Sequence, residues 1–528
     1  MSKRIVAYKD FSGGLSEASN DNMQDNQLSV AQNVVPGDGY GIAKTNGCNM
    51  AFPRIETDKP IIEIVDLAPA TGSIQTLAFT ADCLYKATAA GWVSLLEGTT
   101  GITLAAIKDY FIKANKLYWL DGVKMWVYDG TSIAEAELVP EAPSSPTPAE
   151  TEIWDRVKTS VCVEQRGNRW FYSRAGNNEV IFSKIGEPCG FDVTNIINVN
   201  SKDADSITAL CSFADYLLIF KNKSVWYLSG WDFAGGTDIE LRQLSVTSGT
   251  AFPKTVQIVE NAVLYLGYNG IYRLRLMSLS TVIASENISE GILTDTIRKF
   301  GIVEAWSVVW NNVYYITFKN GTGGLAEYRY YLKLKAFYGA YTMPVHCYSI
   351  SLNTQGLYAG CANGVIVRFD KDVYHYIATE ADVANGIAIG DTIPIPMVAK
   401  TKWFDTVGAM VVDAKIKRIF ISAKQYVAES SMPTIEVRAD YKAIGFSIGI
   451  NADESLVYGE GVFGDTLYGY IPTITKEVSA NFKAKKIQFT IAGANLDYPV
   501  LIYGFALLFK RKRAKGNKEG ITDKEVLE

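Results

Sequence analysis

The sequence predicts an all-β protein whose largest part is a β-propeller of about six or seven blades. Of its 528 residues, 12% are aromatic, including 30 Tyr, and 44 are Gly, a composition that favours strands and tight turns over helices. Hairpin-like units recur at a steady interval, and no sustained apolar stripe has the helical period of 3.6 residues. With 48% hydrophobic and 20% charged residues, disorder throughout the chain is excluded.

The repeated units each contain an aromatic-rich strand, a short turn of Gly, Asn, Asp or Lys, and usually a second strand, as a β-hairpin requires. Six of them start at Lys116, Asn168, Asp215, Asn261, Asn311 and Gln355, so that successive starts lie 52, 47, 46, 50 and 44 residues apart. A weaker copy starts at Thr80. A four-stranded propeller blade needs about that length of chain.

Apolar runs such as Leu217–Phe220 also fit propeller blades. Radial packing buries both faces of each sheet, whereas a half-exposed strand would alternate apolar and polar residues. We therefore expect the propeller to extend over residues 56–370. The alternative is a set of β-sandwiches with similar strand spacing; the steady interval and the recurring aromatic signature favour the propeller.

The remaining segments predict a second domain and a tail. Residues 140–150 hold four Pro, which predicts an extended, exposed connection rather than a strand or helix. Residues 371–400 lack strong periodicity and end in IPIPMVAK, so we expect a domain boundary there. Alternating stretches then predict an antiparallel β-domain, a sandwich or platform, over residues 371–509. Residues 510–528 form a basic tail with seven Lys or Arg against four Asp or Glu.

Residues 1–55 are expected to form an extended N-terminal arm that serves in assembly. The part from residue 10 to residue 50 is rich in Gly, Asn, Asp and Ser, and only scattered apolar residues such as Leu15, Leu28 and Val34 interrupt it. Such a segment is too polar to form its own core and can order only by docking against another surface. We expect that surface to belong to a neighbouring subunit.

The residue types needed for a metal centre or a catalytic triad are scarce. His346 and His375 are the only histidines, and both are expected to be structural. The seven Cys are odd in number and lack any CxxC pair, which indicates buried free thiols in a reducing cytoplasm. We therefore predict no catalytic, cofactor-binding or metal-ligating residue.

Glycine-rich strings carry no phosphate-binding motif. Gly13-Gly14 and Gly321–Gly324 lack a following Lys-Ser and are expected to be turn glycines, while Asp121-Gly122 and Asp129-Gly130 fit hairpin turns. An enzyme is therefore not expected. A pair of catalytic carboxylates stays open as an alternative, because 56 Asp and Glu are available and a glycosidase needs only two.

The sequence contains no uninterrupted run of about 18 apolar residues. Its start, MSKRIVAYKDFSGG, has charges but no apolar region of a secretory signal. These features predict a soluble protein that is not secreted by the signal-peptide route.

The opening FSGGLSEASNDNMQDNQLSVAQNVV resembles that of a family of tailed-phage virion proteins, in which Phe-Ser-Gly-Gly-Leu precedes Asp-Asn-Gln-Leu and Ala-Gln-Asn-Val. Residues 168–192 and 198–230 are similar to the family's blade signature. That signature has two strands ending in Ser, a Gly-Pro turn, an Asp-x-Asp-x-Ile-Thr element and a Leu-Leu-Ile-Phe-Lys strand. The residues that carry the resemblance are Phe11, Gly13, Gly14, Leu15, Asn26, Gln27, Leu28, Asn33, Ser173, Ser183, Pro188, Asp203, Asp205, Ile207, Thr208, Phe220 and Lys221.

The resembling proteins are tail nozzle or hub components of short-tailed bacteriophages. The resemblance implies a β-propeller subunit of a hexamer below the portal and the head–tail adaptor, which builds the DNA ejection channel. It also implies that the hexamer supports tail fibres or tailspikes. It places the protein in the virion tail after assembly in the host cytoplasm, with no membrane insertion by this chain.

The charge distribution fits a channel wall. Residues 1–509 carry a net charge of -8, because the whole chain has -5 and the tail +3. Such a body lets a DNA duplex pass without tight binding. The expected weak DNA contact is the cluster Lys510, Arg511, Lys512 and Arg513, for which a solvated tail is the other interpretation.

A carbohydrate-binding or carbohydrate-active β-propeller is the alternative function. In that case surface aromatic residues would stack on sugars. The oligomeric state separates the two hypotheses, because a sugar-processing propeller needs no hexamer.

Overall fold

The computed structural model describes residues 3–96, 102–140, 146–229, 239–244, 248–276, 283–405, 414–424, 433–440, 442–448, 473–493 and 499–511. Within these ranges the protein has 43 strands and only a few short helices. The helices are α1 (Pro148–Val157), α2 (Thr294–Phe300) and the 3-10 helices η1 (Asp38–Tyr40), η2 (Pro253–Thr255) and η3 (Val383–Asn385). The all-β prediction is confirmed.

Most strands pair antiparallel in groups of four, and seven such groups follow one another in the described part of the chain. The first three groups are β7 (Glu63–Leu67), β8 (Gln75–Phe79), β9 (Leu84–Thr88) and β10 (Gly91–Ser94); β11 (Asp109–Lys113), β12 (Lys116–Leu120), β13 (Met125–Tyr128) and β14 (Ile133–Glu135); and β15 (Ser160–Arg166), β16 (Arg169–Arg174), β17 (Glu179–Phe182) and β18 (Ile196–Asn198). The fourth and fifth are β19 (Ile207–Phe213), β20 (Tyr216–Lys221), β21 (Val225–Ser229) and β22 (Glu240–Gln243); and β23 (Gln257–Val259), β24 (Ala262–Gly267), β25 (Gly270–Leu276) and β26 (Ile283–Asn287). The sixth and seventh are β27 (Ile302–Trp310), β28 (Val313–Asn320), β29 (Leu325–Tyr331) and β30 (Ala336–Tyr341); and β31 (Val345–Ile350), β32 (Leu357–Cys361), β33 (Ile366–Phe369) and β6 (Cys48–Met50).

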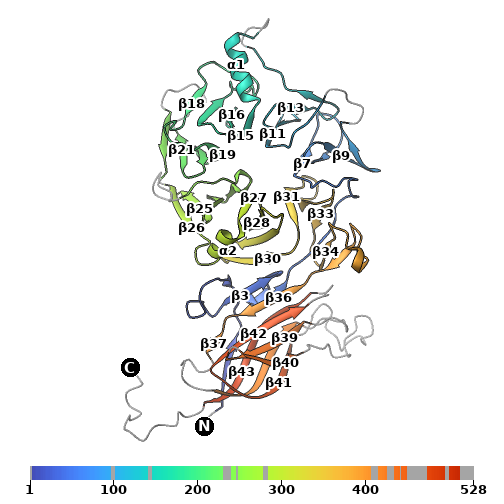
Figure 1. Ribbon diagram of the computed structural model, residues 1–528, viewed down its shortest axis with the longest axis vertical. Coiled ribbons are helices and arrows are strands. Elements are labelled where there is room, and N and C mark those ends of the chain that lie inside the picture. The colour runs from blue at the N-terminus through green and yellow to red at the C-terminus, as the bar shows by residue number, and fades with distance from the viewer. Residues whose placement is uncertain are drawn as a thin grey trace, which may run out of the picture.

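Figure 1 shows these groups arranged around a common centre, and we call them the ring. Each neighbouring pair of groups shares a cluster of buried side chains. The last group also packs on the first, because Cys347 and Tyr358 lie in one cluster with Ile64. The outer strand of the last group is β6, which comes from the N-terminal segment and pairs with β33.

The other strands form two sheets at one end of the molecule, which we call the base (Figure 1). Its strands are β1 (Lys3–Tyr8), β2 (Gly14–Leu15), β3 (Gln27–Gln32), β4 (Val34–Pro36), β5 (Ile42–Lys44), β36 (Met397–Thr401), β37 (Phe404–Asp405), β38 (Ala414–Lys424), β39 (Thr434–Ala439), β40 (Lys442–Ile448), β41 (Thr473–Ala484), β42 (Lys486–Gly493) and β43 (Leu501–Arg511). A hairpin of β34 (His375–Ile377) and β35 (Thr392–Pro394) lies between ring and base in sequence, and it packs on the last ring group.

The two sheets of the base share one hydrophobic core. One sheet has the order β4-β5-β43-β38-β41, with β1 also paired to β43, and the other contains β3-β36-β42-β39-β40. The rings of Phe489 on β42 and Phe505 on β43 stack with centroids 4.1 Å apart, which joins the two sheets face to face. The second sheet continues into the ring, because Ala31 of β3 pairs with Gly339 of β30.

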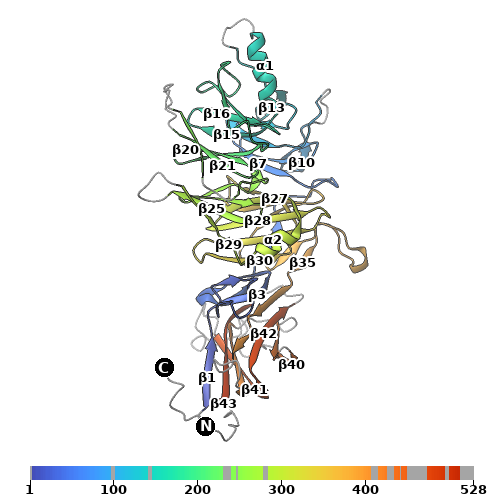
Figure 2. The same ribbon diagram turned by 60° about the vertical axis from the view of Figure 1, so that its left-hand side comes forward.

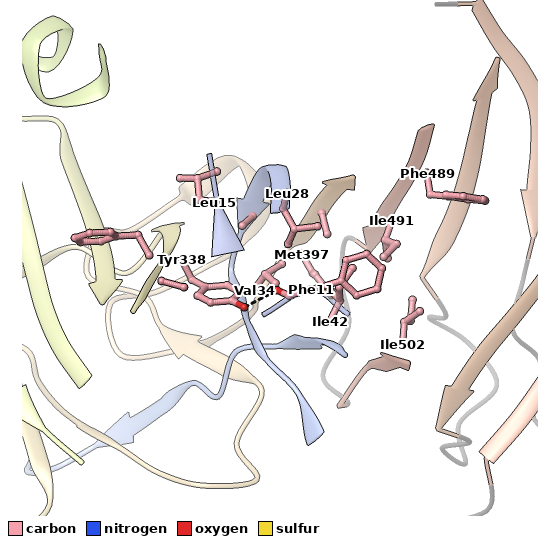
Figure 3. Close-up of a cluster of buried hydrophobic side chains, with 14 of the residues drawn as sticks. Phe11, Leu15, Leu28, Val34, Ile42, Tyr338, Met397, Phe489, Ile491 and Ile502 are labelled. Atoms are coloured by element: carbon pink, nitrogen blue, oxygen red, sulfur yellow. Dashed lines mark hydrogen bonds between the residues drawn. The ribbon is translucent and has the colours of Figure 1, made fainter. Parts of the chain in front are cut away.

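The N-terminal segment is built into its own chain rather than left free for a neighbour. Its strands β1 to β5 belong to the sheets of the base, and β6 belongs to the ring. Phe11, Leu28 and Val34 are fully buried between ring and base (Figure 3). The sequence correctly indicates a segment that docks, but the surface it covers lies on the same subunit.

The Pro-rich connection needs a correction at its end. Residues 148–150 are the first turn of α1, which projects from the ring at the end away from the base (Figure 2). The Thr147 hydroxyl accepts a hydrogen bond from the Glu150 N–H (3.2 Å), and the Glu150 carboxylate accepts one from the Thr147 N–H (2.7 Å). This reciprocal cap, with Pro148 at the first helical position, starts a helix where Pro content alone predicts an extended chain.

Candidate functional site

The centre of the ring holds a cavity of about 740 Å³. The first strand of each of the seven groups lines it: β7, β11, β15, β19, β23, β27 and β31. Its charged lining consists of the carboxylates of Glu63, Asp66, Asp109 and Glu164 and the amines of Lys108 and Lys254.

Three of these carboxylates join neighbouring groups. Each accepts a hydrogen bond from a backbone N–H of a neighbouring group, a donor that the pairing of strands leaves free. The bonds run from Val163 to Asp109 (2.8 Å), from Ser212 to Glu164 (3.1 Å) and from Leu352 to Asp66 (2.8 Å). The acidic lining therefore helps to hold the ring together.

A lysine adds a link between the fifth group and the first. Lys254 lies in η2, directly before β23, and its Nζ is 2.7 Å from Oε2 of Glu63 on β7. Burial favours the neutral amine, but the adjacent Glu63 carboxylate raises the pKa of Lys254 above its ordinary value. Lys254 therefore stays charged and neutralises one of the four carboxylates.

The cavity perturbs the titration of two carboxyl groups. Burial raises the pKa of Asp109 to about 7, although the N–H groups of Val163 and Tyr110 oppose this shift. Burial likewise raises the pKa of Glu164 to about 7, and the negative charge of Asp109 adds to the shift. Such groups can exchange protons near neutral pH and, when ionised, can bind a cationic group.

The two histidines are structural, as expected. His346 on β31 packs edge-on against Trp306, with ring centroids 5.7 Å apart, and burial lowers its pKa to about 4. His375 on β34 lies 3.1 Å from Asn49, through its Nε2 and the amide Oδ1. Neither residue lines the central cavity.

The predictions of free thiols and of turns at the Asp-Gly pairs are confirmed, whereas a reducing cytoplasm stays a prediction. All seven Cys are free, and all but the half-buried Cys83 are buried. Oδ1 of Asp121 accepts hydrogen bonds from two backbone N–H groups of its turn, at 2.7 Å each, and Oδ1 of Asp129 does the same at 2.9 Å. Gly14 has a φ of +64°, and a Cβ there would lie 2.3 Å from the Phe337 carbonyl oxygen of β30, so only Gly fits.

The N-terminal residues that carry the resemblance meet at the junction of ring and base. The Tyr338 hydroxyl of β30 donates a hydrogen bond to the Phe11 carbonyl (2.8 Å), which Figure 3 shows among the buried side chains. Asn33, fully buried with a φ of +53°, donates to the Pro396 carbonyl (2.6 Å) and accepts from the Thr342 N–H (3.1 Å). Around them, hydrogen bonds of Gly13, Asn26 and Gln27 close the loop before β3.

The other residues that carry the resemblance, from Ser173 to Lys221, make hydrogen bonds and buried contacts within the third and fourth ring groups. The fully buried amine of Lys221 is paired with Asp203 at 2.6 Å, and Asp205 accepts from the Lys223 N–H (2.8 Å) in the turn after β20. Thr208 donates to the Thr250 carbonyl (2.6 Å), and Ile207 and Phe220 are buried. In the third group, Ser173 donates to the Glu179 carbonyl, Ser183 accepts from the Trp170 N–H and the Pro188 carbonyl accepts from the Tyr172 hydroxyl.

None of the residues that carry the resemblance lines the central cavity. Sequence analysis in turn missed the cavity carboxylates. The available signal was the acidic residue in the first strand of a hairpin unit, such as Asp109 before KLYWL and Glu164 before NRWFY. Such residues stand out only once the ring places those strands at its centre.

The predicted DNA-contacting cluster lies at the end of the base. Lys510 pairs with Lys3 of β1 and with Lys415 of β38, and Arg511 ends β43. Lys512 and Arg513 lie outside the described residues.

Among the described residues, no group of three or more His, Cys, Asp or Glu is arranged to hold a metal ion. No helix in the same part of the chain is long and apolar enough to cross a membrane.

No protein-family model matches the chain, and no curated protein matches it. Solved structures match with low sequence identity and with TM-scores below 0.5. The extracellular domain of BT4673 from B. thetaiotaomicron is 10% identical with a TM-score of 0.44, and the alignment covers 78% of this chain and 60% of that one. The extracellular domain of BT3049 from the same bacterium is 9% identical with a TM-score of 0.40, covering 90% and 61%.

An exo-β-1,3-galactanase from Phanerochaete chrysosporium is 11% identical with a TM-score of 0.29, covering 78% of this chain and 97% of the enzyme. The chain spans about 60% of the length of the BT4673 extracellular domain.

Proposed function

We propose that this protein is a structural subunit of the tail of a short-tailed bacteriophage, a nozzle or hub that assembles as a hexamer below the head–tail adaptor. The observation that carries the proposal is where the resembling residues lie. They meet at the junction of ring and base and in the links between strands, and none lines the cavity. Residues of that kind maintain a shape rather than perform a reaction.

The architecture supports such a role. A tail subunit that contacts neighbouring subunits and fibres has to keep its ring and base in a fixed relative orientation. Here a continuous sheet runs from β30 through β3 into the base, and one hydrophobic core includes residues of both parts. The net charge of -8 on residues 1–509 suits a channel wall that DNA passes without tight binding.

The finer fold belongs to the same proposal. We propose that the ring is a seven-bladed β-propeller, with β6 completing the seventh blade. In support, seven groups of four strands succeed one another, neighbouring groups share buried clusters, and the last group packs on the first. Closure through an N-terminal strand would fasten the two ends of the repeat array.

A second candidate function is a carbohydrate-binding or carbohydrate-active propeller, and one observation favours it. The cavity brings Asp109 and Glu164 together, and burial raises the pKa of each carboxyl to about 7. A glycosidase requires a carboxylic acid of that kind beside a second carboxylate. Against it, both carboxylates already accept backbone hydrogen bonds that join the ring groups.

The mass of the purified protein separates the two functions. Light scattering on the full-length chain, alone and mixed with a head–tail adaptor protein, should give a complex with six copies of the 58.1 kDa subunit. A protein that stays monomeric in both samples and binds or cleaves oligosaccharides would support the carbohydrate function instead. In that case Asp109→Asn and Glu164→Gln should abolish cleavage.

A further inference from the structure

We infer that the central cavity is a docking site for the basic C-terminal tail of a second copy of this chain. The basic tail is defined here as residues 510–515, KRKRAK. The inference rests on the proposed function, because it names a contact that would join the subunits of the hexamer.

The first argument is the exposed apolar part of the cavity lining. Four large apolar residues that line the cavity stay exposed: Ile112 (41%), Ile258 (50%), Ile350 (37%) and Leu352 (50%). Single exposed apolar residues are common on proteins and need no explanation. Four of them gathered in one concave site indicate a surface that a partner covers.

The second argument is charge. The cavity holds four carboxylates and two amines, and Glu63 already neutralises Lys254 at 2.7 Å. The three other carboxylates of the lining, Asp66, Asp109 and Glu164, then face a single further amine, that of Lys108. An occupant therefore has to bring positive charge together with apolar surface. Lys and Arg side chains supply both, because their aliphatic stems cover apolar residues while the charged ends reach the carboxylates.

The chain itself contains a segment of this chemistry. The basic tail, residues 510–515, contains five Lys or Arg and no Asp or Glu, whereas residues 1–509 are net -8. It follows β43, and Lys510 at the end of that strand pairs with Lys3 at the end of the base away from the ring (Figure 2). That end of the base lies opposite the ring that holds the cavity (Figure 2), so we assign the occupant to the tail of a second copy.

A contact between the tail of one copy and the cavity of the next is heterologous. Repeated around an axis, such contacts form a closed assembly when the rotations between successive copies add up to a full turn. The tail would then replace the N-terminal segment as the fastener between subunits, since that segment is used within its own chain.

The test uses a fluorescent peptide with the sequence of residues 509–518, FKRKRAKGNK, and the full-length protein in which Lys512, Arg513 and Lys515 are changed to Ser. These changes remove the competing tail and leave β43 intact. We expect saturable binding of one peptide per chain, which weakens as the salt concentration rises. A peptide with all Lys and Arg replaced by Ser should not bind.

Variants of the cavity locate the binding. In the same background, Glu164→Gln and Leu352→Ser should each weaken binding by about tenfold. Matched exposed residues outside the cavity serve as controls: Glu137→Gln and Val303→Ser should leave binding unchanged. Equal binding by the cavity and control variants, or no binding of the basic peptide at all, would overturn the inference.

The mass of the tail variant distinguishes this inference from the proposed function. If the unaltered chain forms hexamers and the Lys512, Arg513 and Lys515 variant stays monomeric, the inference is supported. If both form hexamers, the inference fails and the proposed function stands. If the unaltered chain forms no hexamer with the adaptor protein, the proposed function fails, and with it the role of the tail.

Discussion

The ring and the base are both antiparallel β-structures, but they draw their strands from different distances along the chain. Six of the seven groups of the ring consist of consecutive strands, as in β11 to β14 over residues 109–135. In the base, β43 near the C-terminus pairs with β1 and β5 near the N-terminus. The ring therefore depends on local hairpins, whereas the base forms only when the two ends of the chain meet.

Because of this difference, the stability of both regions depends on the N-terminal segment at the junction of ring and base. The N-terminal segment supplies strands to the base and, through β6, the outer strand of the last ring group. Between β5 and β6, Thr45 accepts a hydrogen bond from the Arg329 guanidinium of β29 (2.8 Å). The four predictions below ask how far the two regions depend on this junction.

The largest effect is expected at Arg329. Its Nε is 2.6 Å from Oε1 of the fully buried Glu327, and its guanidinium lies 3.7 Å from the ring centroid of Tyr341. Arg329→Met leaves the buried Glu327 carboxylate uncompensated, so the free energy of unfolding should fall by about 3–5 kcal/mol in denaturant titrations. The double variant with Glu327→Gln should recover part of this loss. A loss below about 1 kcal/mol for the single variant would contradict the role of the pair.

The next effect concerns the apolar side of the junction. Leu28 of β3 is fully buried between ring and base. Leu28→Ala should lower the free energy of unfolding by about 3 kcal/mol, because it leaves a cavity in a shared core. Hydrogen exchange should show faster opening of β36, the partner of β3, than of β12 in the ring. Val303→Ala, at a position that is 54% exposed, is the control and should change stability by no more than about 0.5 kcal/mol.

A smaller effect is expected on the pH dependence of the ring. The pKa of Asp109 is raised to about 7 in the folded protein, so this group binds a proton more tightly in the folded than in the unfolded state. Its contribution to stability is fully present below about pH 4 and is lost as the pH rises to about 7. Asp109→Asn should therefore reduce the loss of stability between pH 5 and pH 8 by an amount on the order of 1 kcal/mol. An unchanged pH profile would show that Asp109 titrates normally.

The smallest effect lies at the periphery of the ring. Thr147→Ala removes one half of the reciprocal cap of α1 and should lower stability by about 1 kcal/mol. The base should be unaffected, which hydrogen exchange of β43 can check. A loss that spreads to the base would mean that ring and base unfold as one unit.

The same contrast explains what the sequence could predict of the fold. The hairpin units at Lys116, Asn168 and Asp215 coincide with β12, β16 and β20, because a hairpin needs only neighbouring residues. The pairing of β1 with β43 could not be predicted, because alternation shows that a strand exists but not which distant strand it joins. The helix α1 was missed although its cap, Thr147 to Glu150, is a local signal.

The sequence left carboxylates open as possible site residues, but it did not show which of them meet or where. The scarcity of His and the isolated Cys predicted neither a catalytic triad nor a thiol pair, and the seven Cys are free in the structure. The cavity carboxylates come from separate hairpin units, and only ring closure brings Asp66, Asp109 and Glu164 together. The raised pKa values of Asp109 and Glu164 depend on that burial, so no local sequence pattern predicts them.

The central claim is that this chain is an assembly subunit rather than a self-contained binding or catalytic protein. Electron micrographs of the full-length protein incubated with a head–tail adaptor protein test it most directly. The account predicts particles with six-fold symmetry that contain both proteins. Single subunits of 58.1 kDa that never associate with the adaptor or with one another would contradict it.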